Sequence, residues 1–323
     1  MIITKTPFRI SLCGGGSDLP AYYKKNGGAV ISTTINKYMY ITSHPSFDKD
    51  VTTLKYSKIE KVKNIDDIKH PIFKECLKYE NIEGLEITSI ADVPQNTGLG
   101  SSSSFTVGLL NILKSYKKEV ISKEDLANLA CEMEINKVGS PIGKQDQYAA
   151  SYGGFNFYEF KKDGSVKVEP VIISKKALKD LERNLILLYV GGEHDSSIIL
   201  TEQSKNITET DKEKGQMRIV ELTYELKEEL KKDNIDFVGE ALHENWLIKQ
   251  TLASGITNKK FDDLYEKALK NGATGGKILG AGGRGFFLFY VPLKKQKDFL
   301  KKMELPEMKF KFESSGSTVI YVN

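Results

Sequence analysis

The chain contains little cysteine and little arginine, and it lacks any long hydrophobic run. The three cysteines, Cys13, Cys76 and Cys131, are an odd number without CxxC spacing, which fits neither a disulfide framework nor a zinc site. The longest apolar run, at about 285–291, is far shorter than the roughly 20 residues of a membrane helix. The first residues lack the apolar segment of a signal peptide. We therefore expect a cytoplasmic protein with reduced cysteines and no membrane partner.

Arginine supplies only four of the 47 basic residues, so the other 43 are lysines. The lysines are interleaved with Glu and Asp, and the formal net charge is +4. Such mixed charge indicates solvated helix faces and argues against nucleic acid as a partner. A mild positive field favours anionic small molecules. A chain of 323 residues with 40% hydrophobic and 28% charged residues is typical of a globular protein with room for two domains.

The order of strand-like and helix-like segments predicts an α+β fold in two domains, 1–180 and 181–323. The first part opens with two segments of β-type alternation around a glycine turn, and a later strand ends at Pro94. Ser122, with an acidic residue three positions later, is typical of a helix start. The second part has an apolar strand, LILLYVGG, and then three long helical patterns between about 211 and 271. This order lacks the strict βαβα rhythm of a doubly wound sheet.

A glycine-serine loop, PQNTGLGSSSS at Pro94–Ser104, lies between a predicted strand and a predicted helix. Its glycines allow the backbone to approach a ligand closely. The following helix offers free N–H groups and the positive end of its dipole, which favour phosphate. Serine hydroxyls are oxygen ligands that suit Mg²⁺, and one serine is enough to cap a helix. The sequence therefore predicts a phosphate-binding loop.

The loop is not a Walker A motif, because GxxxxGK(S/T) occurs nowhere in the chain. It resembles the second signature of the GHMP kinases, Pro-x-x-x-Gly-Leu-Gly-Ser-Ser. This resemblance implies that the loop wraps the phosphates of ATP and that Ser102, or else Ser101, reaches Mg²⁺. The ATP-binding residues implied in this way are Pro94, Thr97, Gly98, Leu99, Gly100, Ser101, Ser102 and Ser103.

A second segment, PFRISLCGGGSDLP at Pro7–Pro20, resembles the first GHMP signature in the form that sugar 1-kinases use. The resemblance implies that Asp18 binds sugar hydroxyls and that Arg9 steadies charge near the transferring phosphate. A fixed guanidinium suits phosphoryl oxygens. The substrate-binding residues implied by this segment are Gly15, Gly16, Ser17 and Asp18.

A third segment, 132–154, contains several acidic residues. Phosphoryl transfer needs a metal ligand and a carboxylate near the attacking hydroxyl, but the spacing alone favours a solvent-facing Glu and a turn Asp. GKQDQYAASYGG resembles the GHMP segment that holds the catalytic aspartate, which implies that role for Asp146. The family's Mg²⁺-binding glutamate lies about a dozen residues upstream, which implies Glu134, with Glu132 as the alternative.

A fourth segment, GGKILGAGGRGF at Gly275–Phe286, satisfies the GxGxxG pattern of dinucleotide-binding folds. A strand-like run follows it where that fold needs a helix, so the context argues against the pattern. The segment resembles the third GHMP signature, Lys-x-x-Gly-Ala-Gly-Gly-Gly-Gly, with Arg284 in place of a glycine. It implies substrate binding by Gly282, Gly283 and Arg284, although a solvent-facing position explains the Arg284 guanidinium equally well. His194 and Ser196 are weaker candidates for substrate contact, since ordinary turn chemistry also explains them.

The resemblance covers the whole chain and implies the two-domain GHMP kinase fold. That fold has an N-terminal ATP-binding domain similar to ribosomal protein S5 domain 2, a ferredoxin-like C-terminal domain, and the site between them. ATP and Mg²⁺ are the implied cofactors. The second and third segments, within PFRISLCGGGSDLPAYY and GKQDQYAASYGGFNF, most resemble D-glycero-D-manno-heptose 7-phosphate kinases, which phosphorylate the anomeric hydroxyl for nucleotide-activated heptose and surface glycan synthesis. The candidates for holding the distal phosphate of such a substrate are Lys24, Lys25, Lys144 and Arg284.

Three alternatives remain at this point. The chain can be a fucokinase-like or other sugar 1-kinase, a sugar sensor that binds ATP without turnover, or a nicotinamide-dependent oxidoreductase. The last rests only on GAGGRG. The sequence leaves the oligomeric state open, and it leaves open which anomer is phosphorylated.

Overall fold

The computed structural model describes residues 1–192, 196–207 and 209–323. The larger sheet is built around two long antiparallel strands, β1 (Ile2–Cys13) and β2 (Gly28–Pro45). The main path of the sheet is β12-β1-β2-β5-β3-β4, and β6, β7 and β11 branch from it. Its other strands are β3 (Thr52–Lys55), β4 (Ile59–Val62), β5 (Leu85–Ala91), β6 (Phe155–Phe160), β7 (Val166–Pro170), β11 (Phe312–Glu313) and β12 (Thr318–Val322).

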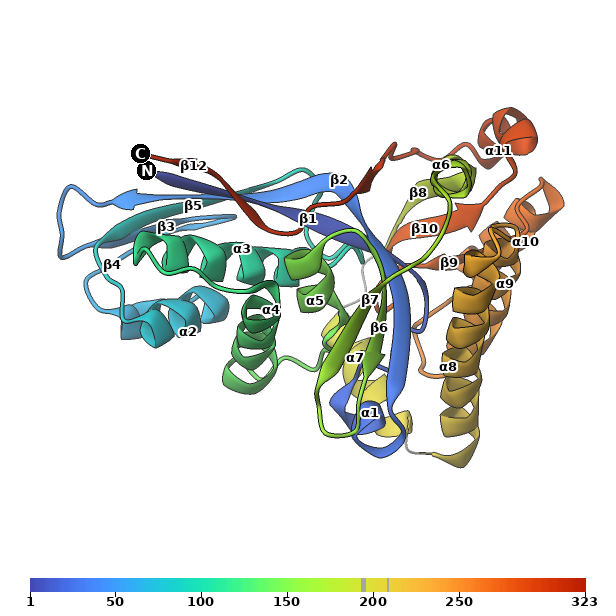
Figure 1. The fold of residues 1–323 in the computed structure, drawn as a ribbon, viewed down its shortest axis with the longest axis horizontal. Helices are drawn as coiled ribbons and strands as arrows, with labels where there is room; N and C mark the ends of the chain where they lie inside the picture. The colour runs from blue at the N-terminus through green and yellow to red at the C-terminus, as the bar shows by residue number, and fades with distance from the viewer. Residues whose placement is uncertain (193–195, 208) are drawn as a thin grey trace.

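Helices cover one face of this sheet (Figure 1). The central one is α3 (Ser101–Tyr116), which packs on β1 and β2 and is buried along nearly its whole apolar length. A helix that is apolar on most sides needs neighbours on most sides. They are α2 (Pro71–Glu80), α4 (Lys123–Cys131) and α5 (Gln145–Tyr152). This packing holds the first turn of α3 beside the middle of β1, with Ser103 and Ser104 buried and Ser102 exposed.

The second sheet is antiparallel, in the order β8-β10-β9, with β8 (Leu185–Gly191), β9 (Gly275–Ile278) and β10 (Gly285–Tyr290). Aromatic side chains join it to its helices: the Trp246 ring lies 5.3 Å from the ring of Phe287, which also stacks on Tyr265. The helices of this part of the chain are α6 (Lys175–Asn184), α7 (Ser196–Asn206), α8 (Thr210–Lys231), α9 (Phe237–Lys249), α10 (Lys259–Lys270) and α11 (Gln296–Met303). The predicted mixture of helices and sheets in an α+β arrangement is confirmed.

The end of the chain returns to the first sheet (Figure 1). β12 pairs antiparallel with β1, and the Met1 amino group donates a hydrogen bond to the carbonyl oxygen of Asn323 at 3.2 Å. The segment after α11 therefore adds two strands, β11 and β12, to the sheet that the N-terminal half builds. The division of the chain at residue 180 stays a prediction.

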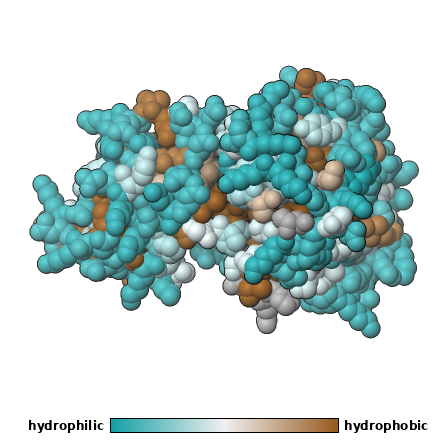
Figure 2. All heavy atoms as spheres, turned by 90° about the horizontal axis from the view of Figure 1, so that it is seen from below, coloured by the Kyte–Doolittle hydropathy of each residue, from teal (hydrophilic) through white to brown (hydrophobic). Residues whose placement is uncertain are grey.

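Hydrophilic side chains cover most of the face seen in Figure 2, which is hollowed between a narrower and a broader part of the molecule. In the part of the chain that the structure describes, every helix is too short or too polar to cross a membrane.

Candidate active site

A buried arginine and an aspartate form the centre of the site. Arg9 lies in the middle of β1 and is 4% exposed, and Asp146 lies in the first turn of α5. The arginine donates Nε–H to Oδ1 of Asp146 and Nη2–H to Oδ2, both at 2.8 Å, which is a bidentate pair. Its Nη1 donates to the carbonyl oxygen of Gly98 at 2.5 Å. One side chain thus links the candidate catalytic carboxylate to the glycine-serine loop.

The glycine-serine loop ends at the N-terminus of α3, where Gly100 is the N-cap and no side chain caps the helix. The first N–H groups of the helix therefore have no side-chain acceptor and are free to bind an anion. Gly98 has a φ of +80°, and a Cβ there would lie 2.3 Å from the carbonyl oxygen of Leu279. Only glycine allows this close approach of the second-signature loop to the third-signature loop.

Ser102 and Glu134 meet beneath this loop. The Ser102 hydroxyl donates to Oε1 of Glu134 at 2.6 Å, and Gln147 Nε2 donates to Oε2 at 2.7 Å. Burial raises the pKa of Glu134, whereas hydrogen bonds from Ser102, Ser103 and Gln147 oppose that rise. Glu132, in contrast, is half-exposed and pairs with Asn136 away from the loop. Of the two glutamates, only Glu134 faces the loop.

Asp18 lies beside the start of α5, close to Asp146. Its Oδ1 accepts from the backbone N–H of Gly16 at 3.0 Å, and its Oδ2 accepts from that of Gln145 at 3.1 Å. Burial raises the pKa of Asp18, and the negative charge of Asp146 raises it further. A Cβ at Gly143 would lie 1.9 Å from Oδ2, so the carboxylate needs a glycine there to hold this position.

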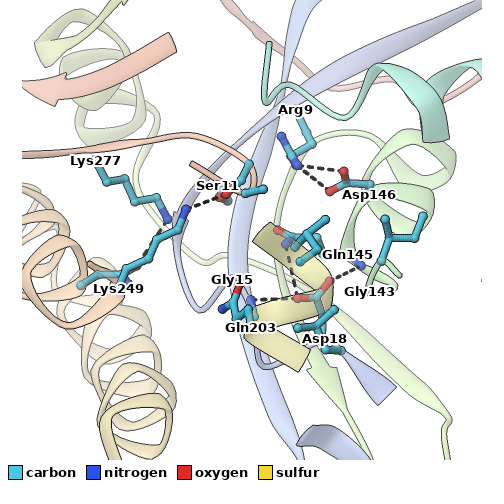
Figure 3. Close-up of a pocket in the computed structure, with 17 residues that line it drawn as sticks. Arg9, Ser11, Gly15, Asp18, Gly143, Gln145, Asp146, Gln203, Lys249 and Lys277 are labelled. Carbon is cyan, nitrogen blue, oxygen red and sulfur yellow. Dashed lines mark hydrogen bonds and ion pairs between the residues drawn. The ribbon is translucent and has the colours of Figure 1, made fainter. Parts of the chain in front are cut away.

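Asp18, Arg9 and Asp146 line one cavity, which is shown in Figure 3 and is named here the acceptor cavity. Gly15 and Gly16 line it too. Ser17 is not among its lining residues, because the hydroxyl of Ser17 donates to the carbonyl oxygens of Gly14 and Ala29 inside the protein. The residues that line the acceptor cavity are Arg9, Ser11, Gly15, Gly16, Asp18, Leu19, Ile142, Gly143, Gln145, Asp146, Leu200, Gln203, Asn245, Lys249, Lys277, Gly280 and Ala281.

Two lysines in the acceptor cavity were not predicted as site residues. Lys249 ends α9 and donates to the carbonyl oxygens of Gly280 at 2.6 Å and Ile278 at 3.2 Å. Lys277 lies on β9 and donates to Oδ1 of Asn245 at 3.3 Å. Burial lowers the pKa of Lys249 far below its usual value and lowers that of Lys277 to about 8. The sequence did contain a signal for Lys277, because a lysine within the small and apolar run GGKIL indicates a buried amine.

A second cleft, named here the nucleotide cleft, begins at the glycine-serine loop and contains Ser101 and Ser102. The rest of its wall is largely apolar and aromatic. Those residues are Met39, Tyr56, His70, Ile72 and Phe105, with Ser89, Gln95 and Asn96. Flat apolar surfaces beside a phosphate-binding loop are the chemistry that the base of a nucleotide requires. The loop therefore borders both cavities. Its Gly98 contacts Arg9 of the acceptor cavity, and its Ser101 and Ser102 line the nucleotide cleft.

Several predicted substrate contacts lie elsewhere. Gly282 and Gly283 pack against Ile256, and Arg284 packs against Gly192, so the third signature lines the acceptor cavity through Gly280 and Ala281 instead.

The lysines expected to hold a distal phosphate also lie outside the acceptor cavity. Lys24 is exposed, Lys25 pairs with Glu213 at 2.7 Å, and Lys144 donates to the carbonyl oxygen of Gly164. His194 and the side chain of Ser196 lie outside the described residues.

A glycine-serine loop at a helix N-terminus, next to an arginine–aspartate pair and a buried glutamate, is an arrangement that suits phosphoryl transfer. The chain belongs to the GHMP kinases. Residues 68–154 match the family described as "GHMP kinases N terminal domain", and residues 226–304 match "GHMP kinases C terminal". The protein is therefore an ATP-dependent phosphotransferase, and the predicted two-domain GHMP kinase fold is confirmed.

Relatives of several substrate classes align along most of the chain. A D-glycero-alpha-D-manno-heptose 7-phosphate kinase of Campylobacter jejuni is 30% identical over 94% of this chain and 93% of its own length. A bifunctional fucokinase/GDP-fucose pyrophosphorylase of Arabidopsis thaliana is 24% identical over 92% of this chain and 30% of its own. The crystal structure of a D-glycero-D-manno-heptose 1-phosphate kinase from Bacteriodes thetaiotaomicron has a TM-score of 0.82 and 23% identity over the full length of both chains, which supports the fold.

Proposed function

We propose that this kinase transfers the γ-phosphoryl group of ATP to the anomeric hydroxyl of D-glycero-D-manno-heptose 7-phosphate. The product would be the 1,7-bisphosphate, a precursor of nucleotide-activated heptose for surface glycans. The observation that carries the proposal is the acceptor cavity, which combines a buried carboxylate, Asp18, with the Arg9–Asp146 pair. The Campylobacter jejuni relative, aligned over nearly the whole chain, supports the choice of sugar.

In this proposal Asp146 orients the attacking hydroxyl and accepts its proton, while Asp18 binds neighbouring hydroxyls. The Arg9 guanidinium holds Asp146 in place and neutralises charge that develops on the phosphoryl oxygens. Helix α3 and the loop before it position the phosphates, and the nucleotide cleft takes the base. Such a site acts mainly by positioning and electrostatic stabilisation, as phosphoryl transfer requires.

The residues beneath the loop fit Mg²⁺. Mg²⁺ is usually held by one or two carboxylates together with substrate phosphates, and Ser102 and Glu134 offer a hydroxyl and a carboxylate oxygen 2.6 Å apart next to the phosphate loop. Among the described residues, no cluster of three or more His, Cys, Asp or Glu could hold the ion without the phosphates. When bound there, Mg²⁺ would neutralise phosphate charge.

Replacing Glu134 with glutamine tests this ligand assignment. The variant keeps the shape and the contact with Ser102 but loses the charged oxygen, so we expect the Mg²⁺ concentration for half-maximal activity to rise on the order of 10-fold or more. Initial rates measured against Mg²⁺ at saturating ATP give this number. The matched control is Glu132→Gln, which should leave the Mg²⁺ requirement unchanged. If the two variants exchanged these results, Glu132 would be the ligand.

The substrate is tested by ADP release with Mg²⁺ and ATP against free and phosphorylated sugars. We expect heptose 7-phosphate to have the highest kcat/KM of the panel. Preference for L-fucose or another free sugar would instead support a fucokinase-like enzyme. L-fucose is included because the Arabidopsis thaliana relative is a fucokinase. ATP binding without turnover of any sugar would support a sensor. Binding of NAD in place of ATP would support an oxidoreductase.

A further inference from the structure

Two buried ammonium groups in the acceptor cavity take no part in the mechanism described above. Lys249, from the end of α9, is 7% exposed, and Lys277, from β9, is 2% exposed. Figure 3 shows that the two side chains converge at the edge of the cavity, on the side away from Asp18. The pair forms one site made from two elements, α9 and β9, that α10 separates in the sequence.

The two ammonium groups lack a compensating negative charge. Each ammonium has three N–H donors; Lys249 uses two on backbone carbonyl oxygens, and Lys277 uses one on Asn245. No carboxylate of the described residues forms a salt bridge with either lysine, and the third cation nearby, Arg9, is already paired with Asp146. Burial without an anionic partner lowers the pKa of both lysines, and an anion in the cavity would favour their charged form.

The position of the pair shows which anion suits it. The lysines line the acceptor cavity, whereas Ser101 and Ser102 of the phosphate loop line the nucleotide cleft, which contains neither lysine. A ligand group that reaches the lysines therefore belongs to the acceptor and not to the nucleotide. The free donors suit the oxygens of a phosphate group, and its two negative charges would balance two ammonium groups.

We propose that Lys249 and Lys277 bind the phosphate group that the sugar acceptor already has. This inference rests on the proposed function, since it identifies the part of the acceptor cavity that would distinguish a sugar phosphate from a free sugar. A free sugar would leave the N–H donors of the two buried lysines unpaired, and a site with unpaired polar groups rejects such an analogue strongly. The pair would therefore determine specificity for a phosphorylated acceptor.

Lys277→Met is the main test, because methionine fills the same space without charge or donors. We expect KM for heptose 7-phosphate to rise about 30-fold or more, as when one partner of a buried charge pair is removed. KM for ATP should change little, and kcat/KM for the unphosphorylated heptose should stay equal or rise, because the variant no longer leaves the Lys277 donors unpaired beside a free sugar. The melting temperature should be no lower than that of the wild type, since the variant removes a buried amine that has no anionic partner. Lys232→Met, on the exposed end of α8, is the control for the substitution itself.

A binding measurement separates this inference from the proposed function. Inorganic phosphate is titrated calorimetrically into the wild type and the variants with a non-hydrolysable ATP analogue and Mg²⁺ present, so that the nucleotide cleft is filled. Binding to the wild type that is lost in Lys277→Met supports the lysine site even if no sugar phosphate of the panel is turned over. Absence of phosphate binding in the wild type would overturn it.

Equal losses on phosphorylated and free sugars would also overturn the inference, because they would indicate a structural role. Lys249→Met removes donors from the carbonyl oxygens of Ile278 and Gly280 and is expected to destabilise the protein. A folded Lys249→Met variant should therefore show the same loss of phosphate binding, and Lys277→Met is the variant whose result decides between a phosphate site and a structural role.

Discussion

Asp146→Asn is expected to lower kcat by on the order of 10³-fold, because a positioned general base contributes about that much. The amide keeps the size of the side chain, and its oxygen can still accept from Arg9, but it cannot take the proton of the attacking hydroxyl. The carboxylate lies outside the nucleotide cleft, so the affinity for ATP should change less than about 3-fold, as expected for an interaction made mainly in the transition state. Steady-state rates and a nucleotide titration measure the two effects.

The control for this variant is Asp263→Asn, an exposed position on α10. It should leave both kcat and nucleotide affinity at wild-type values. Asp146→Asn with ordinary turnover would remove the base role from Asp146. A large loss of ATP affinity would show instead that the carboxylate supports the phosphate loop.

Arg9→Met should have an effect of similar size, with a loss in kcat on the order of 10³-fold or more, as found for arginines that stabilise a transferring phosphoryl group. The change removes a charge from the reaction centre, both hydrogen bonds to Asp146 and the donor to the Gly98 carbonyl oxygen. Arg9→Lys keeps the charge but not the planar fork, so it should restore only part of the activity. Single-turnover rates at saturating substrates measure these differences.

The matched control is Arg183→Met, because Arg183 is exposed and its ion pair with Asp180 is long, at 3.9 Å. It should behave as the wild type. Full activity in Arg9→Lys would mean that charge alone matters at this position. Full activity in Arg9→Met would contradict the mechanism.

Much of the fold was predictable because its periodic patterns are local. The helices predicted within 211–271 correspond to α8, α9 and α10, and Ser122 caps α4 by accepting from the N–H of Asp125 at 3.0 Å. The pairing of β12 with β1 was not predictable, since the sequence of a short strand such as STVIYV does not specify which distant strand it pairs with.

The site divides in a similar way. Arg9 and Asp146 are 137 residues apart, and only the family resemblance suggested that they act together. The two glutamates of 132–137 were hard to separate by periodicity, because this stretch forms a π-helix, in which the positions shift relative to an α-helix.

The two lysines of the acceptor cavity were missed for a different reason. A lysine in the last turn of a helix is an ordinary partner of the helix dipole, so Lys249 had a sufficient local explanation. Lys277 belongs to a signature whose glycines attracted the functional interpretation. Only the three-dimensional arrangement shows that both ammonium groups are buried, close together and without a carboxylate among the described residues.

The proposed reaction is tested most directly by identifying its product. Heptose 7-phosphate is incubated with the kinase, ATP and Mg²⁺, and the products are followed by phosphorus NMR with coupling to protons. The account predicts one new phosphate signal coupled to the anomeric proton, in equal amount to the ADP formed, with the 7-phosphate retained. A new phosphate on any other hydroxyl, or ADP formed without a new sugar phosphate, would contradict it.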